Sequence, residues 1–473
     1  MTTTHSRPPG PKGNSAALII QRLFDSLRPN VETNRESFML TMAEWPKIYG
    51  DQVYYHFFPM HMYMFSHPDD IHDILVKQAD KFHKSTFYKQ ILSRFLGNGM
   101  LISDGEFWKR QRKLAQPAFH HKRIVSYADT MVRYTERMMA GWQHGQVIDA
   151  ADAMMKLTLA IVGKTLFDAD VDAEAKTVGE AMEVIQHTST HSANALIALP
   201  DWVPTAQNRE RRRAVAALDA IVMRMIRERR ESGEDKGDLL SMLLLAVDEQ
   251  DGTGMTDQQA RDEALTLFLA GHETTSNALA WTWYLLGEHP EAEARLHAEL
   301  DRVLAGRAPT MADLKDLPYT EQVIKESMRL YPPAPGFSRQ VIEAVEIGGC
   351  TVPKGASVFI FSYAVHRDER WFPNPLAFQP ERWTPEFEKG LPKYAYFPFG
   401  GGPRICIGNS FAMMETQLVL ATMAQRFQLK LVPGQEIVPE ALITLRPRNG
   451  VQVELIERQP AAAPADHSAV MMP

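Results

Sequence analysis

Cysteine is scarce in this sequence: the chain of 473 residues contains two. Two thiols cannot build a disulfide framework or a four-thiolate zinc cage, so nothing indicates an oxidising compartment. No run of about 18 apolar residues occurs, and the apolar run near the N-terminus is too short for a signal peptide. A basic surplus is also missing, since the net charge is −7, which argues against a nucleic-acid-binding protein. We therefore expect a soluble, cytoplasmic protein.

What the chain has is enough apolar material for a large core, because 45% of its residues are hydrophobic. A core of this size can enclose a bulky cofactor. We find no internal repeat and no linker that would separate domains. Residues 1–14 and 458–473 are rich in proline, alanine and polar residues, and are predicted to be disordered. The sequence thus predicts one domain over residues 15–457.

Helical patterns dominate from about residue 126 to residue 330. Two stretches are extended instead, 51–65 and 344–361, because they contain branched and aromatic residues around turn signals. The predicted fold class is mainly α with a small β region.

One predicted helix is unusually long. Thr256 and Gln259 form a plausible capping box, the helical pattern runs to Gly287, and Pro290 stops it. Its middle, LFLAGHETTSN, interrupts an apolar stretch with a glycine, an acid and hydroxyl groups. Hydroxyls inside a helix bond back to the preceding turn and can distort it, and an acid beside an alcohol can pass protons. The alternative is an ordinary solvated helix face, which the apolar residues before the segment argue against.

The segment FPFGGGPRICIGNSFA contains Cys406 after three glycines. The apolar spacing that follows predicts a helix starting near Ile407, whose free N–H groups would point at the sulfur and stabilise a thiolate. The glycines would let the backbone approach a large planar partner. Taken alone, Cys406 is as readily explained as a small core residue.

The motif around this cysteine resembles the heme-binding loop of the cytochrome P-450 family, Phe-x-x-Gly-x-Arg-x-Cys-x-Gly. Every fixed position matches between Phe399 and Gly408. The resemblance implies the cytochrome P-450 fold, in which a long central helix lies over a heme held by the cysteine loop. It implies heme b (iron protoporphyrin IX) as cofactor and Cys406 as the ligand of the iron. It further implies that Arg404 pairs with a heme propionate, and that Phe399, Gly400 and Gly408 bind the cofactor.

The segment AGHETT, residues 270–275, is similar to the central-helix motif of the same family. The resemblance implies that Thr274 positions dioxygen and that Glu273 relays protons, so both are predicted catalytic residues. Ala270, which begins the motif, is predicted to lie against the heme.

Two further cationic positions match family sites for the heme propionates. Trp108 and Arg112 resemble the family's Trp-x-x-x-Arg, and Arg339 falls where another such arginine is expected. Arginine suits this task because its forked donors match a carboxylate. Three charged residues lie next to this motif: Lys109, Arg110 and Lys113. They form a solvated face or, as a weaker alternative, a docking site for an acidic redox partner.

Glu326 and Arg329 are spaced to share one helix face, and Arg382 follows in FQPERW. As a single pair they would be a weak surface contact. In the family, such a trio forms a structural network, so we assign these residues to the fold that supports the cysteine loop rather than to chemistry.

The resemblance implies a monooxygenase that uses O2 to oxidise a hydrophobic small molecule such as a fatty acid, terpenoid or steroid. No flavin or dinucleotide fingerprint is present, so electrons are expected from a separate ferredoxin or flavodoxin with its reductase. Membrane-bound relatives carry an anchor before a proline-rich segment, which starts here at Pro8, so no membrane anchor is expected. We expect a monomer that binds no nucleic acid. The alternatives are a peroxide-using heme-thiolate enzyme and a non-catalytic heme sensor or carrier.

Overall fold

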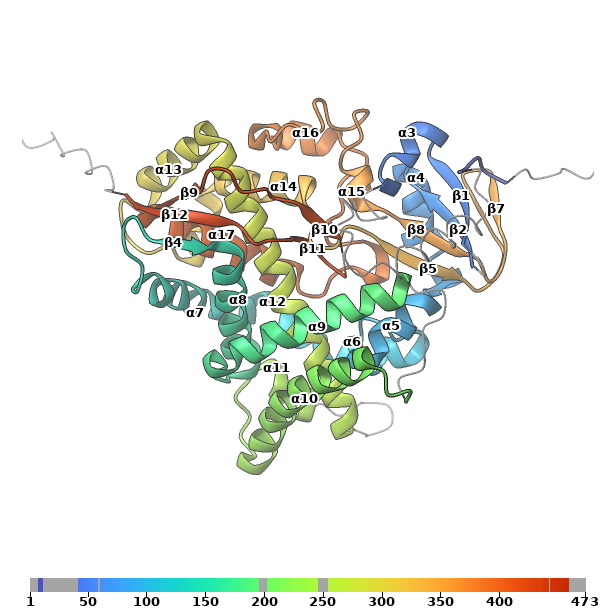
Figure 1. Ribbon diagram of the computed structural model, residues 1–473, viewed down its shortest axis with the longest axis horizontal. Coiled ribbons are helices and arrows are strands. Elements are labelled where there is room, and N and C mark those ends of the chain that lie inside the picture. Colours follow the sequence, from blue (N-terminus) through green and yellow to red (C-terminus); the bar gives the residue numbers. More distant parts are fainter. Residues whose placement is uncertain are drawn as a thin grey trace, which may run out of the picture.

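Helix α12 (Asp257–Glu288) runs through the centre of the computed structural model (Figure 1). Its start confirms the predicted capping box: Thr256 Oγ1 accepts from the Gln259 backbone N–H at 3.2 Å, and Gln259 Oε1 accepts from the Thr256 N–H at 2.9 Å. Pro290 occupies the first turn of the next helix, where its missing N–H is harmless. At 1.5 Å per residue, α12 is about 48 Å long, long enough to cross the whole domain.

The structure describes residues 7–11, 41–57, 60–194, 202–245, 254–441 and 443–458. Of the first segment predicted to be disordered, residues 7–11 lie along the sheet, where the Pro9 carbonyl accepts from the Tyr54 N–H at 3.1 Å. The rest of that segment lies outside the described residues, as does the tail after Arg458. None of the helices that the structure describes has the combined length and hydrophobicity that a membrane crossing needs.

Helices make up most of the described chain, as predicted. Besides α12 they are α3 (Trp45–Tyr49), α4 (Pro68–His72), α5 (Thr86–Leu96), α6 (Gly105–Ala115), α7 (His121–Met139), α8 (Ala150–Phe167), α9 (Ala175–Asn194), α10 (Ala206–Ser232), α11 (Leu239–Leu245), α13 (Pro290–Leu304), α14 (Pro318–Leu330), α15 (Ser362–Val365), α16 (Pro385–Gly390) and α17 (Asn409–Arg426). Short turns of 3-10 or π-helix are η1 (Asp73–Lys77), η2 (Ala79–Lys81), η3 (Gln116–Phe119), η4 (Asp172–Glu174), η5 (Met311–Asp316), η6 (Pro380–Arg382) and η7 (Gly402–Arg404).

The β structure is small, also as predicted. Its largest sheet has the order β1-β2-β8-β5-β3, in which only the β2–β8 pair is parallel. A second sheet has the order β4-β12-β9, and two further ladders pair β6 with β7 and β10 with β11. The strands are β1 (Gln52–Phe57), β2 (Met60–Phe65), β3 (Phe82–Lys84), β4 (Val147–Asp149), β5 (Phe337–Val341), β6 (Val345–Ile347), β7 (Cys350–Val352), β8 (Ser357–Ile360), β9 (Phe427–Leu431), β10 (Pro439–Ala441), β11 (Leu445–Pro447) and β12 (Gln452–Glu457).

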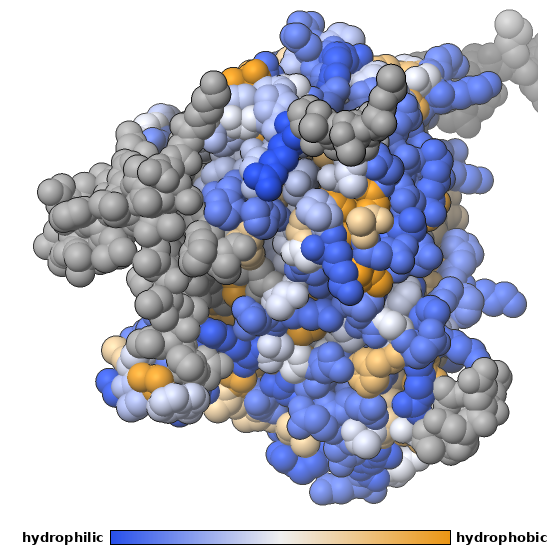
Figure 2. Space-filling model, turned by 90° about the vertical axis from the view of Figure 1, so that its right-hand side faces the viewer, coloured by the Kyte–Doolittle hydropathy of each residue, from blue (hydrophilic) through white to orange (hydrophobic). Residues whose placement is uncertain are grey.

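The five-stranded sheet and the helical part occupy opposite sides of the molecule (Figure 1). Helix α12 packs against α8, α10, α14 and α17, and its residues from Ala260 to Leu269 are buried without interruption. A helix that is apolar on every side belongs in the centre of a large core. The face nearest the five-stranded sheet is mainly hydrophilic, with hydrophobic residues in small separate groups (Figure 2).

Candidate functional site: a cysteine loop, a central helix and a cluster of buried cations

The cysteine loop joins η7 to α17. The Cys406 N–H donates to the Phe399 carbonyl at 3.0 Å, which closes the loop on itself. Helix α17 begins at Asn409 with Gly408 as its cap, two residues later than the predicted start near Ile407. The first helical hydrogen bond runs from the Ala412 N–H to the Gly408 carbonyl at 2.8 Å. At this N-terminus the Gly408 N–H interacts with the Cys406 sulfur and lowers the pKa of the thiol.

Two of the three glycines before Cys406 serve a different purpose from the one predicted. A Cβ on Gly402 would lie 1.8 Å from the Leu75 carbonyl oxygen, and one on Gly401 would lie 2.3 Å from a ring carbon of Tyr394. These two glycines therefore let the loop pack on its own protein. Gly400, with φ of +71°, has no atom within 4 Å of such a Cβ, so it alone faces open space where a planar partner fits.

The surface of Cys406 is partly accessible, although protein atoms surround the residue on most sides. Burial raises the pKa of its thiol, while the Gly408 N–H and Arg112 lower it. Ala270 is likewise exposed, although it lies in the middle of a helix whose neighbouring residues are buried. An exposed residue deep in a fold borders a hollow, so both residues line internal space of the kind that a large cofactor needs.

The cysteine loop meets the region of α6 through Arg404, which ends η7, and Arg112, which lies on α6. The Arg404 guanidinium donates to the Ser103 carbonyl at 2.8 Å and to Asp104 Oδ1 at 2.6 Å, and lies 3.7 Å from the centre of the Trp108 ring. Arg112 donates to the Ile405 carbonyl at 2.9 Å. Thus Trp108 and Arg112, predicted from one motif, meet Arg404, predicted from another.

Arg339 lies in the five-stranded sheet and is buried. Burial, together with the nearby charge of Arg404, lowers its pKa to about 10. In the described part of the chain Arg339 forms no ion pair; its guanidinium donates to the Ser338 carbonyl at 3.1 Å. A buried charge without an opposite charge is costly, and proteins keep such groups where a ligand supplies the missing charge.

A further cation at this place, Lys84, was not predicted from the sequence. Burial, Arg339 and Arg404 hold its pKa well below the ordinary value. The one carboxylate of the cluster, Asp104, already accepts from Arg404 and pairs with Lys89 at 2.6 Å. The described cluster therefore carries more positive than negative charge. This surplus fits an anionic group such as the propionates of a heme, with a thiol and an open-sided glycine beside it.

On α12, the predicted catalytic residues face different ways. The Thr274 hydroxyl donates to the Ala270 carbonyl at 2.8 Å, and the Thr275 hydroxyl to the Gly271 carbonyl at 3.1 Å. These back-bonds were predicted, and α12 continues as one helix through this segment. The Glu273 carboxyl is buried, and burial raises its pKa. It bonds to other elements rather than to Thr274.

A second missed residue is Glu415 on α17, whose side chain is fully buried beside Thr275. Within the described chain neither of its carboxylate oxygens receives a hydrogen bond, since the Thr275 hydroxyl donates elsewhere. Burial therefore raises its pKa well above the usual range. The signal was available in the sequence: a glutamate stands within the apolar run MMETQLVL.

Glu326, Arg329 and Arg382 form the predicted network. Glu326 and Arg329 have side chains that are 0% exposed and are joined by two hydrogen bonds of 2.8 Å, while Arg382 donates to Glu326 Oε1 at 3.0 Å. Arg329 also donates to three carbonyls on the segment 366–377. The trio thus fastens α14 to the chain that leads to the cysteine loop.

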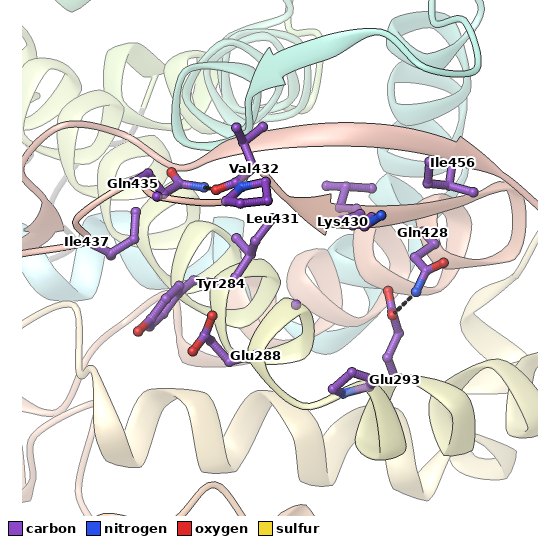
Figure 3. A pocket seen from close by; sticks show the side chains of 15 residues that line it. Tyr284, Glu288, Glu293, Gln428, Lys430, Leu431, Val432, Gln435, Ile437 and Ile456 are labelled. Carbon is purple, nitrogen blue, oxygen red and sulfur yellow. Dashed lines mark hydrogen bonds between the residues drawn. The ribbon is translucent and has the colours of Figure 1, made fainter.

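A groove on the described surface lies elsewhere. It measures about 700 Å³ and opens between the C-terminal end of α12, the start of α13 and strand β9 (Figure 3). Glu293, which accepts from Gln428 Nε2 at 2.6 Å, lines it, and burial raises the pKa of this carboxyl to about 7. None of the predicted site residues lines this groove. It is about 20 Å along α12 from Ala270, so we assign the active site to the cysteine loop.

Comparisons with known proteins agree with this geometry. The family model for Cytochrome P-450 matches residues 26–454. The chain is 39% identical to cyclooctatin synthase of Streptomyces melanosporofaciens over 84% of this chain and 87% of that protein. It is 38% identical to cyclooctat-9-en-7-ol 5-monooxygenase of the same organism over 83% and 88%. The crystal structure of a cytochrome P-450DA heme domain superposes with a TM-score of 0.84 at 26% identity, covering 96% of this chain and 98% of that one.

These matches span most of the chain and include the cysteine loop, the central helix and the arginines described above. They also confirm the predicted fold and reaction class. The chain belongs to the cytochrome P-450 family of heme-dependent monooxygenases, which use O2 and a redox partner to oxidise hydrophobic substrates.

Proposed function

We propose that this monooxygenase oxidises a terpenoid. Of the three substrate classes expected from the sequence, terpenoids are favoured by the relatives, one of which is named for oxidising position 5 of cyclooctat-9-en-7-ol. The shared length supports the comparison, because each protein covers more than four fifths of the other. The choice between terpenoid skeletons lies with side chains that surround the hollow next to Ala270.

We further propose that the cofactor is heme b and that Cys406 donates its sulfur to the iron. The observation that carries this proposal is the surplus of positive over negative charge around Asp104, next to a thiol near the N-terminus of α17. Arg112, Arg339, Arg404 and Lys84 would hold the two propionates, and the Trp108 ring supports the Arg404 guanidinium. Phe399, Gly400, Gly408 and Ala270 would contact the ring. When bound, heme b supplies the activation of O2, and a thiolate ligand favours cleavage of the O–O bond.

The chain's own contribution on the O2 side is the handling of protons. Thr274 holds a proton at Oγ1, which now points to the Ala270 carbonyl and can turn toward the hollow. Glu273 is the acid that resupplies it: burial raises its pKa above the ordinary value of a carboxyl, which favours the proton-bearing form. The apolar surroundings exclude water, so that protons arrive through these groups.

For electrons, we propose a separate ferredoxin or flavodoxin with its reductase. A groove of about 570 Å³ lies outside the cysteine loop and is lined by Phe399, Ile405, Val76 and Lys393, among others. Ile405 and Val76 are exposed apolar side chains, and Lys109 of α6 is exposed as well. A face that combines apolar and basic groups around Cys406 suits an acidic electron donor. Cytoplasmic location and a monomeric state stay predictions.

The test is reconstitution of the purified, heme-loaded enzyme with a ferredoxin or flavodoxin and its reductase. Terpenoids, fatty acids and steroids are added in turn, and the shift of the Soret band on binding is followed by product analysis under O2. We expect terpenoids to shift the band and to give oxygenated product that requires reductant. Binding and turnover of fatty acids or steroids alone would refute the terpenoid assignment. Product formation with peroxide but never with reductant and O2 would favour the peroxide-using alternative.

A further inference from the structure

The Glu273 carboxyl is held by two elements that are distant from it in the sequence. Its Oε1 accepts from the Thr444 hydroxyl at 2.5 Å and from Gln186 Nε2. Thr444 precedes β11 in the β10–β11 hairpin, and Gln186 lies on α9. The exposed fractions are 4% for Glu273, 2% for Gln186 and 6% for Thr444. Two donors thus converge, away from water, on a single oxygen of the acid.

The direction of the Thr444 hydroxyl is fixed by a third residue. Asn277, one helical turn after Glu273, donates from Nδ2 to Thr444 Oγ1 at 3.2 Å. A hydroxyl has one proton, so with its oxygen accepting from Asn277 the proton goes to Glu273. One turn further, Trp281 Nε1 donates to the Leu445 carbonyl at 3.0 Å. Residues 273, 277 and 281 share one face of α12, and all three bind the hairpin.

The other half of the carboxyl is left free. Within the described chain, hydrogen bonds reach only Oε1 of Glu273, so Oε2 is available to a proton. Both donors therefore favour the ionised form of the acid, while Oε2 can still take up a proton.

Charged groups around this acid come from each element packed against it. Arg446 on β11 pairs with Glu440 of β10 at 3.0 Å and lies 3.1 Å from the His187 ring of α9. On α12, burial lowers the pKa of His272 to about 4, which keeps that ring neutral. For Glu273, burial raises the pKa, and Thr444, Arg446 and Gln186 lower it. The residues of α8 that touch this stretch, Met155 and Thr158, do not titrate.

We propose that Thr444 and Gln186 are positioning residues for the acid Glu273: they hold its carboxyl by one oxygen and set the pH range in which it gives up its proton. This inference rests on the proposed role of Glu273 and deepens it. A purely structural role would fasten the hairpin to α12 without affecting titration of the acid. The two roles differ in a measurable way.

The experiment is infrared difference spectroscopy of the heme-loaded, substrate-free enzyme as a function of pH. The carbonyl stretch of protonated Glu273 is assigned as the band that Glu273→Gln removes. In Thr444→Val and in Gln186→Leu, loss of a donor to the carboxylate makes the ionised form less stable. We expect the protonation midpoint to rise by about one pH unit in each variant. Thr444→Ser keeps the hydroxyl and should titrate as the wild type does.

The matched control is Thr282→Val. Thr282 is equally buried on the same helix, but its hydroxyl donates to the Ala278 carbonyl, away from Glu273. Its midpoint should not move. In the same variants, the fraction of reductant that is converted to product is measured as a function of pH. In Thr444→Val and Gln186→Leu, the pH at which this fraction falls should rise together with the protonation midpoint.

An unchanged midpoint in Thr444→Val and Gln186→Leu would overturn the inference, even if both variants lose thermal stability. So would the absence of any pH-dependent carboxyl band that Glu273→Gln removes. Because the band is recorded without turnover, it remains informative if Glu273 proves to have no part in proton delivery. That failure of the proposed function would show separately, as unchanged coupling in Glu273→Gln.

Discussion

Lys84 lies directly opposite Arg339 in the antiparallel ladder of β3 and β5. Two like charges across a ladder repel each other, and here both have their pKa lowered by burial and by the additional charge of Arg404. Such a pair lowers the stability of the folded protein. This loss of stability is explained if an anion, here the heme propionates, completes the cluster.

Removing one of these cations should therefore raise the stability of the heme-free protein while it lowers the affinity for the cofactor. In Lys84→Met we expect the free energy of unfolding of the heme-free protein to rise by on the order of 1 kcal/mol, because an unfavourable buried charge is gone. Heme affinity should fall about tenfold, a loss of roughly 1.4 kcal/mol. Denaturant titration of the apoprotein and transfer of heme to a scavenger protein measure the two effects. The control is Lys109→Met, an exposed residue paired with Glu106, which should change neither. A fall in both stability and affinity would contradict this assignment.

The Glu326 network should behave as a structural element. Glu326→Gln leaves Arg329 and Arg382 without the carboxylate that both contact. Breaking one partner of a buried network costs about 3–5 kcal/mol. We expect a large fall in the denaturation midpoint together with poor retention of heme. On the same helix, Glu321 pairs with Lys325 at an exposed position, so Glu321→Gln should cost less than about 1 kcal/mol. Equal effects of the two substitutions would refute the structural role.

The pH dependence of stability should report on Glu263. This buried acid on α12 accepts from the Met100 N–H at 3.0 Å, and burial raises its pKa to about 7. A raised pKa means that the folded state favours the protonated carboxyl. The resulting stability is complete below the unfolded value of 4.5 and is lost as the pH rises to about 7. Across that range wild type should lose up to about 3 kcal/mol relative to Glu263→Gln. Parallel stability profiles of the two proteins, measured by denaturant titration, would contradict it.

Thr274→Ala should lower the fraction of reductant that yields product without loss of heme. Heme binding should persist, because the hydrogen bond that the described structure gives the Thr274 side chain stays within its own helix, at the Ala270 carbonyl. Without the hydroxyl, the proton held at Thr274 Oγ1 would be missing and water would have to supply protons in place of Glu273, so reducing equivalents should appear as peroxide. The measurement is the ratio of product to reductant consumed. Thr282→Ala on the same helix is the control, and unchanged coupling in Thr274→Ala would disprove the assigned role.

Sequence patterns predicted the parts of this site that depend on local order. The capping box at Thr256, the long helix and the Glu326–Arg329 pair are all local, and the structure confirms each. The start of α17 was misplaced by two residues, because Gly408 adopts a cap conformation that periodicity does not reveal.

Long-range pairing was beyond prediction from one sequence. Lys84 joins the site because β3 pairs with a strand more than 250 residues away, and a three-residue strand has almost no pattern. Thr444 reaches Glu273 across 171 positions. Such contacts follow from packing of whole elements, and no spacing rule encodes them. Buried carboxyls within apolar runs, such as Glu415, are the one local signal that could have extended the predicted site.

The central claim is that the Cys406 sulfur donates to heme iron, and the most direct test is the absorption spectrum of the reduced carbon monoxide complex. Wild-type enzyme and Cys350→Ser, which alters the other, buried cysteine, should both show the strongly red-shifted Soret band of a thiolate ligand. Cys406→Ser should lose that band. A red-shifted band that persists in Cys406→Ser, or a wild-type spectrum typical of an imidazole-ligated heme, would contradict the account.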